Sequence, residues 1–199
     1  MLEPAMRHLI DTYIRAEESE KISAFDDLSL VELIVERGSD AVKELPKGIR
    51  ENREAVAETI ENNVRKLIID EQPINPKYYE KMSELLDALI EQRKKEALGY
   101  QEYLARIVDL TRKVNNPSTG YVYPTAMDTG AKRALYDNLG KNEALALAVD
   151  NAIHENRQDD WRSNPFKVKK VKLAIKSMLQ DDEELTEKTL ELVKNQHEY

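Results

Sequence analysis

The sequence predicts an all-α fold of about eight to ten helices, on three observations. Apolar residues recur at intervals of three and four along most of the chain, which is the spacing of one buried helix face. Residues that cap or end helices stand at the boundaries of these segments. Alternation with a period of two, typical of strands, is almost absent. Tyr121-Val122-Tyr123 is the one weak strand candidate, and it would add a very short β-like stretch.

In the first half of the chain, capping residues mark the predicted boundaries. Ser29 is a predicted N-cap, because its hydroxyl can accept from the first helical turn, and Gly38 is a predicted helix end. Asn75 followed by Pro76 marks another start, since proline suits the first helical position. The helices predicted here span residues 5–18, 29–35, 39–45, 49–69, 76–97 and 101–114.

An irregular segment, residues 115–128, separates these helices from a second set. It contains two turn signals, Asn116-Pro117 and Tyr123-Pro124. We expect one helical domain over residues 1–199, with a sub-boundary at this segment. The helices predicted beyond it span residues 130–138, 142–156, 165–179 and 182–195.

Composition excludes several classes of protein. The 199 residues carry a formal net charge of −8 and include no cysteine, which excludes a disulfide scaffold, a thiol nucleophile and cysteine-ligated metal sites. No apolar run approaches the roughly 18–20 residues of a membrane span. The N-terminus also lacks a basic-then-apolar signal pattern. We therefore expect a cytoplasmic protein with no membrane partner.

The motifs of common nucleotide and metal chemistry are missing as well. A phosphate-binding loop ends in Gly-Lys-Ser or Gly-Lys-Thr, whereas the one Gly-Lys pair here, Gly140-Lys141, is followed by asparagine. No lysine has an acid two residues before it, as a PD-(D/E)xK nuclease requires. The three histidines have no ligand spacing. The residues therefore predict no catalytic, cofactor or metal site.

Charge is unevenly distributed near the C-terminal end. Residues 161–178 contain basic side chains and no acid, whereas residues 179–199 are acidic. Such a basic patch suits DNA phosphates or an acidic protein surface. The alternative is a solvated helix face, partly neutralised by the acids of residues 181–184. Lys169, Lys172 and Lys176 are predicted to share one side of a helix. The candidate contact residues are Arg162, Lys167, Lys169, Lys170, Lys172 and Lys176.

Two large aromatic residues flank the turn at Asn164-Pro165. Trp161 and Phe166 are expected to fill a core, because that is the usual place of large aromatic side chains. The alternative is that they anchor an interface.

Long segments of the chain carry a family resemblance. They are RAEESEKISAFDDLSLVELIVERG at residues 15–38, LPKGIRENREAVAETIENNVRKLIIDEQPINPKYYEKMSELLDALIEQRK at 45–94, WRSNPFKVKKVKLAI at 161–175 and LELVKNQHEY at 190–199. These segments resemble the C-terminal region of the restriction (R) subunit of type I restriction–modification enzymes.

The resemblance implies that the chain is the helical tail of a longer subunit. That subunit translocates and cuts DNA with ATP and magnesium, using motor lobes and a nuclease that have no counterpart here. The implied partners are the modification and specificity subunits of the methyltransferase core, onto which the tail would dock the R subunit. Nonspecific duplex DNA is an alternative partner for the basic segment, and a structural brace for the motor lobes is a third interpretation.

Overall fold

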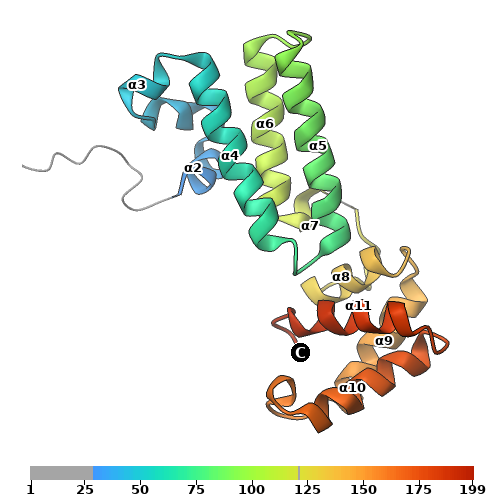
Figure 1. Cartoon of the computed structure of the whole chain (residues 1–199). Helices are drawn as coiled ribbons and strands as arrows, with labels where there is room; N and C mark the ends of the chain where they lie inside the picture. Colours follow the sequence, from blue (N-terminus) through green and yellow to red (C-terminus); the bar gives the residue numbers. More distant parts are fainter. Residues whose placement is uncertain (1–28, 121) are drawn as a thin grey trace, which may run out of the picture.

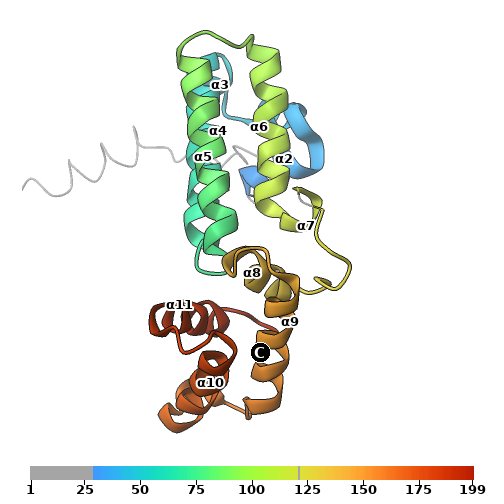
Figure 2. The ribbon, with the colours of Figure 1, turned by 90° about the vertical axis from the view of Figure 1, so that its right-hand side faces the viewer.

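The computed structural model describes residues 29–120 and 122–199 and confirms the all-α prediction. Within these residues the chain forms ten α-helices and two short 3-10 helices, with no strand. The helix predicted for residues 5–18 lies outside the described part. Figures 1 and 2 show the helices in two groups that follow one another along the molecule, α2 to α7 and then α8 to α11.

The bounds of the elements follow the chain. The first group contains α2 (Leu30–Arg37), the 3-10 helix η2 (Gly38–Glu44), α3 (Lys47–Arg50), α4 (Arg53–Glu71), α5 (Pro76–Lys94), α6 (Tyr100–Asn115) and α7 (Pro117–Gly120). The second group contains α8 (Gly130–Asn138), α9 (Glu143–Asn156), the 3-10 helix η3 (Trp161–Ser163), α10 (Pro165–Met178) and α11 (Glu183–Lys194).

The predicted caps at Ser29, Gly38 and Asn75 are confirmed. Ser29 Oγ accepts from the Glu32 amide at 3.3 Å, and the Glu32 carboxylate accepts from the Ser29 amide at 2.6 Å, which completes a capping box. Gly38 ends α2 with φ of 61°, a conformation that glycine adopts without strain. Asn75 Oδ1 accepts from the Tyr78 amide at 3.4 Å at the start of α5.

Three predicted elements have different bounds or form. The helix expected at residues 49–69 is two helices, because Asn52 has an extended backbone and caps α4 through the amides of Glu54 and Ala55. Residues 38–44 form a 3-10 helix rather than the expected α-helix. Helix α5 ends at Lys94, before the predicted residue 97.

The weak strand candidate is wrong for the residues that the structure describes. Val122 and Tyr123 have no regular secondary structure, and Tyr121 lies outside the described part. A three-residue extended stretch has no neighbouring strand with which to pair in this helical fold. The Tyr123 hydroxyl instead donates to Asp137 Oδ2 at 2.7 Å.

The buried side chains form two hydrophobic clusters that share no residue. One lies between Leu30 and Val114 and the other between Met127 and Tyr199. In the first cluster Leu86 on α5 is fully buried, whereas its neighbour Leu85 is 44% exposed. The helical turn directs Leu86 inward and leaves Leu85 at the edge of that face.

A charged network is buried within the first cluster. The Arg93 guanidinium on α5 donates to both oxygens of Glu61 on α4, at 2.8 and 3.1 Å, and also to Glu54. The Tyr103 hydroxyl on α6 donates to Glu61 Oε1 at 2.9 Å. Glu61 is 6% exposed, so its charge depends on these donors. The network therefore ties three helices together.

A polar seam joins the two groups where α5 begins. Asn75 donates to Asp137 at 2.8 Å, and its oxygen accepts from Asn138 at 2.8 Å. Near the C-terminal end, Gln196 Nε2 donates to the carbonyl of Ile74 at 2.7 Å. The hydrophobic clusters share no residue, so these hydrogen bonds, together with the packing of α8 against α5, hold the two groups against each other.

Candidate functional site

Helix α10 carries most of the basic residues singled out in the sequence. Asn164 caps it by accepting from the amides of Phe166 and Lys167, and Pro165 occupies its first position. Val171 and Ile175 bury one face of α10 against α9 and α11. Figures 1 and 2 place this helix at the end of the molecule remote from α2 to α7.

The three lysines predicted to share one side of this helix do not form one open patch. Lys172 pairs with Glu183 at 2.7 Å and also with Glu187, and Lys176 pairs with Glu183 at 2.6 Å. Hydrogen bonds from Lys172 and Lys176 lower the pKa of Glu183 to about 2. This part of the basic face is therefore neutralised by α11, as the alternative interpretation anticipated for residues 181–184.

Two other basic candidates are bound to the backbone of the chain. Arg162 donates through Nε to the Lys194 carbonyl at 2.9 Å and through a terminal nitrogen to the Gln196 carbonyl at 2.5 Å. Lys167 Nζ donates to the Asp159 carbonyl at 2.6 Å. Arg162 and Lys167 therefore have a structural role, because they hold the segments around α10 in place.

Lys169 and Lys170 are exposed and form no ion pair with any described residue. They lie beside two exposed apolar side chains, Phe166 at 85% and Leu173 at 56% exposure. The intervals of four and three residues from Phe166 through Lys170 to Leu173 place all three on one side of the helix. We call Phe166, Lys169, Lys170 and Leu173 the open face of α10.

The two aromatic candidates therefore have opposite environments. The core position expected of both is confirmed for Trp161, which is 3% exposed, and is wrong for Phe166. Phe166 is the second residue of α10 and follows Pro165 on the side away from Val171, so it points away from the cluster. Met178, the last residue of α10, is 37% exposed.

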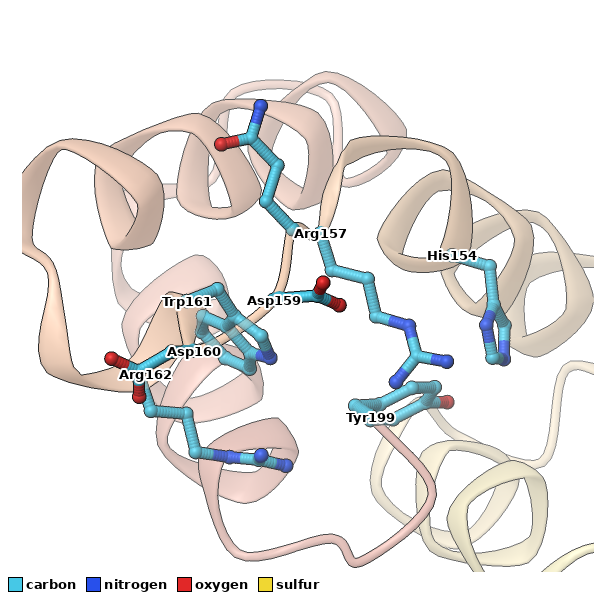
Figure 3. A pocket seen from close by; sticks show the side chains of 8 residues that line it. His154, Arg157, Asp159, Asp160, Trp161, Arg162 and Tyr199 are labelled. Atoms are coloured by element: carbon cyan, nitrogen blue, oxygen red, sulfur yellow. The ribbon is translucent and has the colours of Figure 1, made fainter.

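A pocket of about 380 Å³ lies beneath Trp161. It is formed where the end of α9, the following turn, η3 and the end of the chain meet, and Figure 3 shows it closely. We call it the Trp161 pocket. Its principal lining residues are His154, Arg157, Asp159, Trp161, Arg162 and Tyr199.

Sequence reasoning did not identify Leu173 of the open face, nor several residues that line the Trp161 pocket. Leu173 could have been found, because it lies seven residues after Phe166 and so shares its side of a helix. Arg157, His154 and Tyr199 carry no such signal, because the pocket brings together residues far apart in the sequence. Glu183 and Glu187 were part of an acidic segment, and only the packing of α11 on α10 shows which lysines they neutralise.

Other kinds of site were sought in the described residues. They contain no cluster of three histidine, cysteine or acidic side chains arranged to hold a metal ion. None of their helices combines the length and the apolar character needed to cross a bilayer. No protein-family model, curated protein or solved structure matches this chain.

Proposed function

We propose that this chain is a non-catalytic assembly module, the helical C-terminal part of the R subunit of a type I restriction enzyme. In this proposal it docks the ATP-dependent translocating and cleaving subunit onto the methyltransferase core, in the cytoplasm. The support is the resemblance of residues 15–38, 45–94, 161–175 and 190–199, together with one structural observation. That observation is the open face of α10, where Phe166 and Leu173 stand exposed beside unpaired lysines.

The composition of this face favours a protein partner over DNA. Interfaces between proteins are commonly centred on aromatic and aliphatic side chains surrounded by charges, which steer association. Contacts to the DNA backbone use basic and polar groups and gain little from an exposed Phe166 or Leu173. Duplex DNA remains the alternative partner, and it would use Lys169 and Lys170 through their charge.

The test is a titration of the purified chain against the methyltransferase core and, separately, against nonspecific duplex DNA, at low and moderate salt. Binding to the core that survives moderate salt is expected. Phe166→Ser should weaken core binding at least tenfold, because hot-spot residues typically contribute ~2 kcal/mol or more. Val122→Ser is the matched control, because Val122 is 98% exposed and lies in the segment before α8.

Reversing the charge of the two unpaired lysines tests whether they take part in binding. Lys169→Glu with Lys170→Glu is compared with Lys66→Glu and Lys94→Glu, which reverses two exposed lysines of the first group. Core binding should weaken only in the α10 variant. Salt-sensitive DNA binding without core binding would overturn the docking proposal in favour of a DNA track. Binding to neither partner would overturn it in favour of a brace for the motor lobes.

A further inference from the structure

We propose that the Trp161 pocket binds a carboxylate group, through the indole N–H of Trp161 and the guanidinium group of Arg157. This inference does not rest on the proposed function, because it depends on a different surface and on different residues. The carboxylate could belong to an acidic side chain of a partner or to a free organic acid. The proposal concerns their shared chemistry.

The first observation is an unpaired hydrogen-bond donor. Trp161 is 3% exposed, and its Nε1 is the one buried side-chain nitrogen or oxygen of the described residues that has no hydrogen-bond partner. Figure 3 shows this nitrogen on the edge of the ring that faces Arg157 and Tyr199. Buried donors are paired in most folded proteins. The indole N–H therefore calls for an acceptor inside the pocket.

The second observation is the remaining donor capacity of the two arginines. Arg157 uses one terminal nitrogen to donate to the Glu198 carbonyl at 3.0 Å. The Arg162 guanidinium lies 5.1 Å from the centre of the Trp161 ring and donates to two backbone carbonyls. A guanidinium group has five N–H donors, so neither side chain is saturated. Its planar fork fits the two oxygens of a carboxylate.

The pocket is also lined by two acidic side chains, whose negative charge opposes the binding of an anion. The carboxylate of Asp160 already accepts a hydrogen bond from the Ser163 hydroxyl, at 2.5 Å. The carboxylate of Asp159 has no hydrogen-bond partner among the described residues and lines the same pocket. An incoming carboxylate must therefore overcome repulsion from Asp159. Removing that charge should therefore tighten the binding of a carboxylate in the pocket.

Trp161 makes the test specific, because it is the only tryptophan of the chain. One indole cross-peak is expected in a ¹H–¹⁵N correlation spectrum, and it reports on this pocket. The probes are glutarate, a blocked peptide with one glutamate among neutral residues, and inorganic phosphate, each at an ionic strength matched with sodium chloride. Glutarate or the peptide is expected to move the indole proton downfield in a saturable manner, whereas chloride is not.

Three variants locate the effect. Arg157→Gln should weaken glutarate binding about tenfold, because it removes a charge-assisted donor. Asp159→Asn should tighten it about threefold. Arg50→Gln is the matched control and should leave it unchanged, because Arg50 likewise donates to one backbone carbonyl, that of Lys43. If Arg157→Gln alters the circular dichroism spectrum, Asp159→Asn alone decides.

The outcomes are distinct. Peptide binding at least as tight as that of glutarate assigns the carboxylate to a protein partner, and binding of glutarate alone assigns it to an organic acid. The absence of a saturable indole shift overturns the proposal. A response to phosphate alone also overturns it. A third result also overturns the proposal: ligand-free Asp159→Asn shows a large indole shift, and the wild type does not respond to glutarate. In that case Asp159 is the acceptor of the Trp161 indole N–H.

Discussion

Replacement of Arg93 with methionine tests the buried network of the first group. Methionine retains much of the apolar stem of arginine, so the change removes the guanidinium without opening a large cavity. Glu61 then loses two charge-assisted hydrogen bonds of 2.8 and 3.1 Å and retains only the hydroxyl of Tyr103 at 2.9 Å. A carboxylate that is 6% exposed would be left without a charged partner.

The expected loss of stability is large for a domain of this size. Removing one member of a buried ion pair costs about 3–5 kcal/mol. The Arg93 side chain is 10% exposed and Glu54, its second partner, is 60% exposed, so water reaches one side of the network. We therefore expect the lower end of the range, about 3 kcal/mol. This is a substantial part of the ~5–15 kcal/mol that stabilises a typical domain.

Urea denaturation is the assay, with circular dichroism to follow both groups and Trp161 fluorescence to follow the second. Arg93→Met should shift the circular dichroism transition, whereas Arg65→Met should cost under ~1 kcal/mol, because the Arg65–Asp87 pair is exposed. The double variant Glu61→Met with Arg93→Met should recover most of the loss. A cost for Arg93→Met equal to that of Arg65→Met would refute this reasoning.

Three further predictions concern other contacts. The lowered pKa of Glu183 means that its stabilising contribution is present above the unfolded value of 4.5 and is lost as the pH falls toward about 2; melting temperatures measured across this range should fall less steeply in Lys172→Met than in the wild type. Asn75→Ala removes a helix cap and the bond to Asp137, so it should cost about 2 kcal/mol in urea denaturation and make unfolding of the two groups less cooperative. Ser29→Ala breaks the capping box of α2 and should cost about 1 kcal/mol by the same measurement, a prediction that an unchanged midpoint would contradict.

Local signals in the sequence were sufficient for most of the fold. The caps at Ser29 and Asn75 were predicted because a capping hydrogen bond involves residues within one helical turn. The division between α3 and α4 was missed, because apolar periodicity continues across Asn52 and hides its capping role. Leu85 and Leu86 show a related effect: adjacent leucines both fit a helical stripe, and the neighbouring helices determine which one is buried.

The candidate surface was predictable only in part. The acid-free segment drew attention to the lysines of α10, but which of them remain unpaired depends on the position of α11. Lys172 and Lys176 face Glu183, whereas Lys169 and Lys170 do not, and no rule of sequence spacing relates residues on two packed helices. The exposure of Phe166 is likewise a tertiary property, because composition alone favours burial of a large aromatic side chain.

The separation of the two hydrophobic clusters has a consequence for synthesis of the chain. Every buried residue of the first cluster precedes residue 115, so that cluster is complete before any residue of the second is translated. Chains grow at about 5–20 residues per second, which is slow compared with the folding of small helical units. The first group can therefore fold on the ribosome while the second is still being made. Asn75 is then already in position at the start of α5 when its partner Asp137 is translated.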